Sequence, residues 1–255
     1  MKEVGKVYDK FRIEEIKEHF ANRPFTSKEL YQFYLEYEPD LKQNTFRWRI
    51  YNLKQSGIIT SVKRGTYMLE SRKTFAPPIS LSLKRIYNKI KEQFPYIEAS
   101  LWETNWLANY MVHQPRTDNI IIEVDKDAME SVFALFQETK NNVFLNPNKH
   151  DVETYLMTGK SNIVVKNLVV ESPIQLQNKI YVPKIEKIIV DLFVDKDLFI
   201  MYQGQELANI YDALFESFSI NQSTLNRYAT KRKVKERLID FIIQQTTIDK
   251  NNIYI

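Results

Sequence analysis

The chain has 255 residues, of which 44% are hydrophobic and 27% are charged; this is ordinary globular usage and excludes disorder as its main state. The length predicts one large or two modest domains. Cysteine is absent, which excludes disulfides, thiolate zinc sites and cysteine nucleophiles. With three histidines and five glycines, neither a histidine-rich metal site nor a glycine-rich cofactor loop is expected. No apolar run reaches ~18 residues and no apolar signal core is visible at the start, so we expect a cytoplasmic protein without a membrane partner.

The net charge of +4 is unevenly distributed along the chain. Residues 1–75 hold 15 Lys and Arg against 10 Asp and Glu, whereas the remaining 180 residues hold 21 against 22. Residues 41–73 alone carry eight bases and one acid, Glu70. Concentrated positive charge favours a polyanion, because each neutralised phosphate releases counterions. A second basic cluster comprises Arg227, Lys231, Arg232, Lys233, Lys235 and Arg237.

Two helices are predicted before residue 40. Ile13, Ile16 and Phe20 recur at helical spacing and predict a helix that ends near residue 21. Thr26 is followed three residues later by Glu29, which is a capping-box signature. It predicts a second helix that continues to about residue 36.

A third helix is predicted from about residue 43 to residue 56, where Gly57 suits a left-handed helix end. Phe46, Ile50 and Leu53 form its narrow apolar stripe. Its other faces contain no acid and carry amides, aromatic rings and arginine, which are partners for base edges and phosphates. These residues are Asn44, Trp48, Tyr51 and Gln55, with Arg47 and Asn52 on the flanks.

A basic hairpin follows, with strands at 58–62 and 66–69 and a turn at 63–65. Three helices followed by a basic hairpin predict a winged helix-turn-helix domain over 1–75, with the third helix in the major groove and the wing on a flanking backbone or minor groove. A winged helix used only for protein contacts is the alternative. The predicted DNA-binding residues are Lys42, Asn44, Thr45, Arg47, Trp48, Arg49, Tyr51, Lys54, Lys63, Arg64 and Thr66.

Residues 76–255 are predicted to form a mixed α/β domain with a helical C-terminal end, after a linker at 71–80. The fold class expected for the whole chain is therefore α+β. Pro183 is expected in the first turn of a helix. Strands are predicted at 97–102, 119–124, 143–146, 163–169 and 175–181, and helices at 81–94, 106–111, 126–139, 149–157, 185–193, 205–218, 221–228 and 231–245.

Catalytic motifs are incomplete. Thr158-Gly-Lys-Ser161 resembles the end of a P-loop, but Thr154 stands where its first glycine belongs. Glu123 and Lys126 do not have the spacing of a PD-(D/E)xK nuclease, and Asp125-Lys-Asp127 lacks the Gly-Ser of a nucleotidyltransferase and is expected to cap the next helix. We therefore expect no enzyme activity and no cofactor. Two further polar features, Asp195-Lys-Asp197 and His113, are expected to be structural.

Several segments resemble AbiEi-family antitoxins, transcriptional regulators of abortive-infection toxin–antitoxin loci. They are Phe25–Leu30, Thr45–Lys54 and Gly57–Tyr67, with Val143–Pro147 and Pro183–Phe193 in the C-terminal half. The resemblance implies a winged helix that represses its own operon. It also implies a C-terminal domain that counteracts a nucleotidyltransferase-like toxin encoded beside it, without requiring a stable complex. The C-terminal half is longer here than in compact members.

Two other functions stay open. One is a winged-helix transcriptional regulator whose C-terminal domain senses a ligand or oligomerises. The other is a nuclease or nucleotidyltransferase fused to a DNA-binding domain, which the incomplete motifs disfavour. A neighbouring toxin gene distinguishes an antitoxin from an ordinary regulator. The expected partners are double-stranded DNA of the protein's own operator and the toxin.

Overall fold

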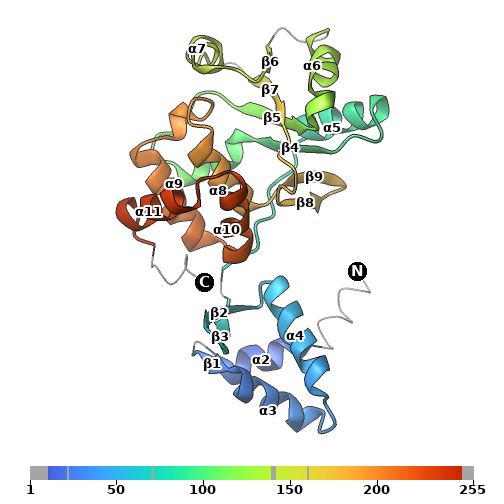
Figure 1. The fold of residues 1–255 in the computed structure, drawn as a ribbon, viewed down its shortest axis with the longest axis vertical. Coiled ribbons are helices and arrows are strands. Elements are labelled where there is room, and N and C mark those ends of the chain that lie inside the picture. The colour runs from blue at the N-terminus through green and yellow to red at the C-terminus, as the bar shows by residue number, and fades with distance from the viewer. Residues whose placement is uncertain (1–10, 22, 71, 139–141, 160, 249–255) are drawn as a thin grey trace. The chain divides into compact units, whose positions relative to one another are not determined.

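The computed structural model describes residues 11–21, 23–70, 72–138, 142–159 and 161–248, without the side chains of Val62 and Lys63. The chain divides into two compact units, residues 1–74 (unit 1) and 75–255 (unit 2), one residue before the expected boundary (Figure 1). Each unit has a hydrophobic core of its own. The predicted α+β fold class is confirmed.

The described residues of unit 1 combine three helices with a small antiparallel sheet in the strand order β1-β3-β2. The three predicted helices and the predicted hairpin are confirmed, whereas the two-residue strand β1 was too short to produce a pattern. In chain order the elements are α2 (Ile13–Phe20), β1 (Phe25–Thr26), α3 (Ser27–Tyr37), α4 (Gln43–Gln55), β2 (Ile59–Lys63) and β3 (Thr66–Leu69).

Local chemistry fixes the ends of these helices. Thr26 Oγ1 accepts a hydrogen bond from the Glu29 N–H (3.2 Å) and the Glu29 carboxylate accepts one from the Thr26 N–H (2.7 Å), as the capping box predicts. The Thr26 N–H, together with the Arg23 guanidinium, lowers the pKa of Glu29 to about 2. Gly57 follows the end of α4 with φ +67°, a left-handed conformation that a glycine adopts at little cost.

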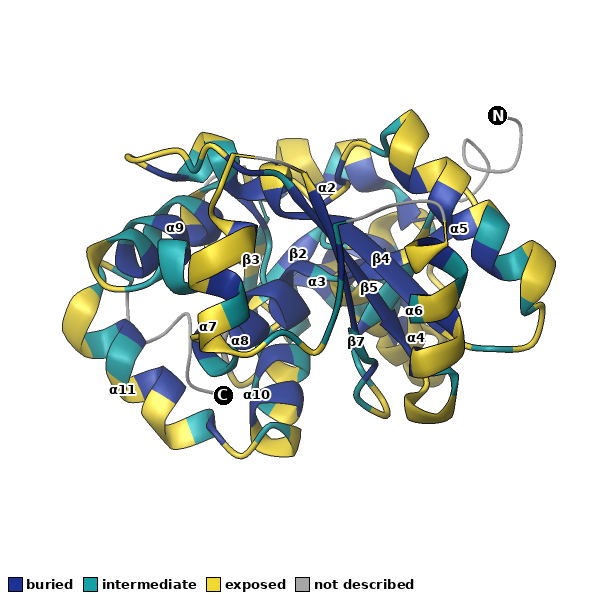
Figure 2. Ribbon diagram, turned by 90° about the horizontal axis from the view of Figure 1, so that it is seen from above, coloured by how far each residue is buried: buried dark blue, intermediate teal, exposed yellow. Residues whose placement is uncertain are grey.

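Unit 2 is built on a four-stranded sheet of order β4-β5-β7-β6. The strands are β4 (Ala99–Glu103), β5 (Asn119–Val124), β6 (Val143–Leu145) and β7 (Asn162–Asn167). β4 is antiparallel to β5, and β5, β7 and β6 run parallel. Every residue of β4 and β5 is buried (Figure 2), as expected for strands that are covered on both faces.

Helices cover both faces of this sheet. α5 and α6 lie on one side and α8, α9, α10 and α11 gather on the other (Figures 1 and 2). The helical elements of unit 2 are α5 (Leu81–Gln93), η1 (Thr104–Tyr110), η2 (Lys126–Ala128), α6 (Met129–Gln137), α7 (Lys149–Asp151), η3 (Val152–Leu156), α8 (Ile185–Val194), η4 (Ile200–Tyr202), α9 (Gln205–Ser217), α10 (Gln222–Lys231) and α11 (Lys235–Gln245).

The predicted single strand at 175–181 is wrong. The segment is a hairpin, β8 (Ile174–Gln177) and β9 (Ile180–Pro183), with Leu176 opposite Tyr181. Its turn residues, Asn178 and Lys179, have φ +49° and +67°. Two left-handed residues match the twist of a tight hairpin, but the missing glycine conceals the turn in the sequence.

Three smaller expectations also need correction. Pro183 ends β9 instead of opening α8, whose N-cap is Lys184. Asp125 does not cap η2; its side chain instead accepts a hydrogen bond from the Glu98 N–H (2.9 Å). The predicted helices at 106–111 and 149–157 are a 3₁₀ helix, η1, and an α turn that continues as the π turn η3.

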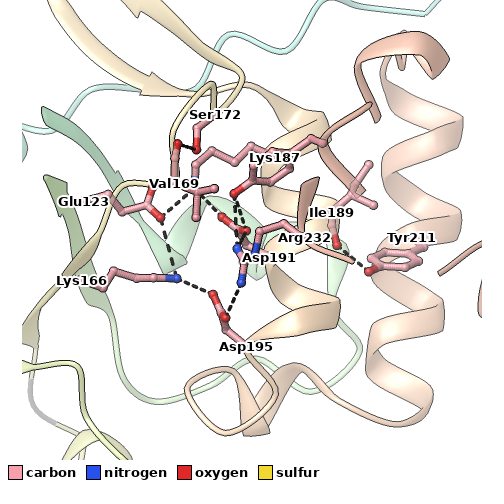
Figure 3. Close-up of polar contacts among 11 residues, drawn as sticks. Glu123, Lys166, Val169, Ser172, Lys187, Ile189, Asp191, Asp195, Tyr211 and Arg232 are labelled. Atoms are coloured by element: carbon pink, nitrogen blue, oxygen red, sulfur yellow. Dashed lines mark hydrogen bonds and ion pairs between the residues drawn. The ribbon is translucent and has the colours of Figure 1, made fainter. Parts of the chain in front are cut away.

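Six ionised side chains of alternating sign form a closed ring inside unit 2 (Figure 3), here called the charge ring. Lys187 Nζ lies 2.7 Å from Glu123 Oε1, and Arg232 Nη2 lies 2.7 Å from Asp195 Oδ1. The widest contact, 3.8 Å, joins Lys166 Nζ to Glu123 Oε1. In order around the ring the residues are Glu123, Lys187, Asp191, Arg232, Asp195 and Lys166.

The charge ring links β5, β7, α8 and the segment after α10. Burial alone would lower the pKa of Lys187, but the carboxylates of Asp191 and Glu123 raise it above its ordinary value. Burial alone would raise the pKa of Asp191, but the cations around it, Lys187 first, lower it. Tyr228 Oη also donates a hydrogen bond to Asp191 (2.9 Å). Each carboxylate of the ring therefore lies between two cations.

Removing one cation from this ring should destabilise unit 2 strongly. We expect Lys187→Met to lower the free energy of unfolding by about 3–5 kcal/mol, because Glu123 and Asp191 would be left buried without the ammonium group. The matched control is Lys196→Met, since Lys196 is exposed and outside the ring. Urea denaturation of the full chain measures both, and equal stabilities would show that the charge ring contributes little.

Candidate nucleic-acid interface

The outward surface of α4 is polar, aromatic and basic. Trp48 and Tyr51 are 47% and 61% exposed, although the Trp48 ring also stacks on Phe11 at 5.6 Å between centroids. The helix has no acidic residue, and its N-cap residue, Lys42, makes no side-chain capping bond. Backbone N–H groups of the first turn and the positive end of the helix dipole therefore add to the positive field. The predicted residues that lie exposed here are Lys42, Asn44, Thr45, Arg47, Trp48, Tyr51 and Lys54.

Arg49 is the correction to the predicted DNA-binding set. Its side chain is only 4% exposed, and its Nη2 lies 2.7 Å from the Glu38 carboxylate at the end of α3. Its guanidinium carbon lies 4.7 Å from the centroid of the Tyr34 ring. Arg49 therefore joins α4 to α3 inside unit 1 and is not available to a phosphate. The missing signal was Glu38, which lies in the turn before α4 and provides the counter-charge.

The turn of the β2–β3 hairpin presents one described cation, Arg64, which is exposed beside Gly65. Gly65 has φ +73° and its Cα faces open space, as a hairpin tip requires. The side chain of Lys63 lies outside the described residues. Thr66 is half-buried and pairs with Thr26 of β1, so it contributes to the sheet more than to the outer surface.

The exposed basic residues of α4, its N-cap and the hairpin turn that the structure describes are not neutralised by acids of the protein. Within the described part of the chain, Lys42, Arg47, Lys54 and Arg64 form no ion pair. By contrast, Arg72 pairs with Glu70 through Nε at 2.8 Å. The surface therefore carries unpaired positive charge, which is the condition for attracting a polyanion.

The C-terminal basic cluster is partly neutralised by acids of unit 2. Arg232 belongs to the charge ring, and Lys231 Nζ lies 3.3 Å from Glu171. Lys235 opens α11, in which Glu236 follows directly. Two of the six bases are thus committed to partners within unit 2, so the sequence cluster overstates the available charge.

The polar motifs set aside above lie in the following surroundings. Thr158–Ser161 lies between η3 and β7, whereas a P-loop follows a strand and opens a helix; Lys160 lies outside the described residues. His113 Nδ1 lies 2.6 Å from Glu206 Oε1, and that carboxylate also accepts the Val112 and His113 N–H groups. Glu123 belongs to the charge ring. The sequence feature that could have indicated this ring is the Lys187–Asp191 pair in the mostly apolar helix α8.

The described residues contain no group of three or more His, Asp or Glu side chains arranged to hold a metal ion. Among the same residues, every helix is too short or too polar to cross a bilayer.

The architecture defines an α+β chain in which a helical unit with a small sheet precedes a larger mixed unit. The model of the family of unknown function DUF6577 matches residues 45–248, and the chain belongs to this family. The match begins within α4 and includes the hairpin of unit 1 as well as most of unit 2. No curated protein matches the chain.

Replacing Arg49 or Arg47, which are separated by one residue, should have very different effects on the stability of unit 1. Arg49→Ala should lower the free energy of unfolding of unit 1 by about 2 kcal/mol, because it removes a charged hydrogen bond and leaves a cavity beside Tyr34. Arg47→Ala should change it by less than about 0.5 kcal/mol, because that side chain is exposed. Thermal melting of both variants measures the difference, and equal losses would contradict the assignment of Arg49 to the core.

Proposed function

We propose that unit 1 is a winged helix-turn-helix that binds double-stranded DNA, with α4 in the major groove. The observation that carries this proposal is the surface of α4, which combines unpaired cations with amide, hydroxyl and aromatic groups and has no acid. The strand order β1-β3-β2 and the chain order of three helices and a hairpin support the same interpretation.

Within this proposal, different residues contact the DNA bases and the DNA backbone. Asn44, Arg47 and Tyr51 lie three and four residues apart, so they share one face of α4. Arginine recognises guanine and asparagine recognises adenine through paired hydrogen bonds in the major groove. Arg64 at the hairpin turn is placed by its exposure and charge to contact phosphate or a minor groove.

We also propose that the chain is a non-enzymatic antitoxin that represses its own operon and counteracts a nucleotidyltransferase-like toxin. The support is the resemblance of the α4 and hairpin sequences, Thr45–Lys54 and Gly57–Tyr67, to AbiEi-family antitoxins. In this role the protein acts in the cytoplasm, and unit 2 counteracts the toxin. A winged-helix regulator with a ligand-sensing unit 2 is the second candidate, favoured by the cavity described below.

DNA affinity should depend steeply on salt. Residues 41–73 contain eight Lys and Arg residues. Arg49 and Arg72 are paired within the protein, which leaves six basic side chains for contact with phosphates. Neutralising about six phosphates predicts that log K falls with log salt concentration at a slope of about −5. Fluorescence anisotropy with a duplex from upstream of the gene measures the slope, and a flat response would exclude electrostatic binding by this surface.

Variants at α4 and at the hairpin should separate specificity from general affinity. Arg47→Ala should cost about 1–3 kcal/mol on the operator and relax discrimination at one base position. Arg64→Ala should weaken binding to operator and scrambled duplexes equally and reduce the salt slope by about one. Lys63→Ala is expected to behave as Arg64→Ala does. If all variants keep the wild-type operator-to-scrambled ratio, α4 is not the element that reads the sequence.

Toxin antagonism should survive the loss of DNA binding. If a nucleotidyltransferase-like toxin is encoded beside the gene, co-expression of the full chain should restore growth in cells that express it. Arg47→Ala should restore growth equally while losing repression of an operon reporter, because its change is confined to α4. Failure of the wild-type chain to restore growth would refute the antitoxin role and leave DNA binding intact.

A further inference from the structure

Unit 2 contains a cavity of about 380 Å³ between residues 75–80, η1 and the end of α9. This volume lies within the range of small-molecule sites. Four aromatic rings line it and touch edge to face in sequence: Trp106 on Phe75 (6.2 Å), Phe75 on Phe218 (5.2 Å) and Phe218 on Tyr110 (5.7 Å). Part of the cavity wall is therefore a continuous aromatic surface.

The one carboxyl group in the wall of this cavity is that of Glu103, at the end of β4. Glu103 is only 8% exposed and accepts a hydrogen bond from Ser80 Oγ. The residues lining the cavity include no Lys, Arg or His, and within the described part of the chain no cation pairs with Glu103. Burial, and secondarily the nearby Asp118 carboxyl, raise the pKa of Glu103. A bound cation would supply the missing counter-charge.

A second polar group in the cavity wall lacks a good partner. The indole N–H of Trp106 is buried, and although it lies close enough to Glu103 to affect that carboxyl, it makes no hydrogen bond of proper geometry. A buried donor without a partner costs free energy. The side of the wall that holds Glu103 and Trp106 is therefore polar but incompletely satisfied by the protein itself.

We propose that this cavity binds a small organic cation, in which an amidinium or ammonium group on a flat aromatic body contacts Glu103. Aromatic faces attract cations through their quadrupole and also bury the apolar body of such a ligand. An anion is disfavoured because it would lie against Glu103 with no cation to neutralise it. The site is separate from the proposed DNA surface, and its occupancy can be measured without DNA.

Three probes of nearly the same shape test the charge requirement: benzamidine, benzamide and benzoate. Isothermal titration of the full chain should show benzamidine binding at least tenfold more tightly than neutral benzamide, and no measurable binding of benzoate. Equal affinities for benzamidine and benzamide, or binding of benzoate, would overturn the proposal.

Two variants locate the binding. Glu103→Gln keeps the shape and the acceptor for Ser80 but removes the charge, and it should weaken benzamidine at least tenfold. The matched control, Glu130→Gln on the exposed side of α6, should leave affinity unchanged. Asn109→Trp fills the rim of the cavity at an exposed position and should abolish binding while preserving the melting temperature. Wild-type affinity in Asn109→Trp would exclude the cavity, even if Glu103→Gln failed to fold.

Discussion

The packing of unit 2 depends on six buried or half-buried charges that compensate one another. Each ion alone would cost several kcal/mol to remove from water, so none is tolerable without its two neighbours. The charge ring joins elements that lie far apart in the sequence, with Glu123 on β5, Lys166 on β7 and Lys187 on α8. Hydrophobic contacts alone tolerate sliding of a helix over a sheet, whereas alternating charges in direct contact do not. The ring therefore determines where the C-terminal helices attach to the sheet.

An ion pair of a buried arginine positions the proposed DNA-binding surface of unit 1 in the same way. Arg49 reaches inward to Glu38, and this pair fixes how α4 is rotated against α3. Arg47, two residues earlier, lies about 200° around the helix and is exposed. The buried arginine thus sets which side chains α4 presents, and a slip of the helix by one residue would carry Arg47 out of the exposed face.

Local patterns in the sequence predicted the elements that depend on neighbours in the chain. The capping box at Thr26 and Glu29, and the glycine at 57, act within a few residues and were visible as motifs. Apart from the Lys187–Asp191 pair, the ion pairs of Arg49 and of the charge ring join residues 11 to 64 positions apart, and no local pattern records such pairs. The β8–β9 hairpin was missed for another reason: Asn178 and Lys179 adopt a glycine-like conformation without glycine. Of the proposed interface, the exposed face of α4 was predictable from periodicity, whereas the cavity of unit 2 was not.

Paired charges stabilise the fold of this protein, and unpaired charges indicate where it can bind a partner of opposite charge. In unit 2 the acids and bases of the ring cancel, so Arg232 adds little to an external field although it belongs to a basic segment of the sequence. In unit 1 Lys42, Arg47, Lys54 and Arg64 are exposed and form no ion pair within the described residues, so a net charge of only +4 understates the local attraction for a polyanion. Glu103 is the opposite case, a buried carboxyl without a cation in an aromatic cavity. The wall of that cavity begins at Phe75, the first residue of unit 2. A ligand held there would contact the first residues of unit 2, which follow unit 1 directly in the sequence.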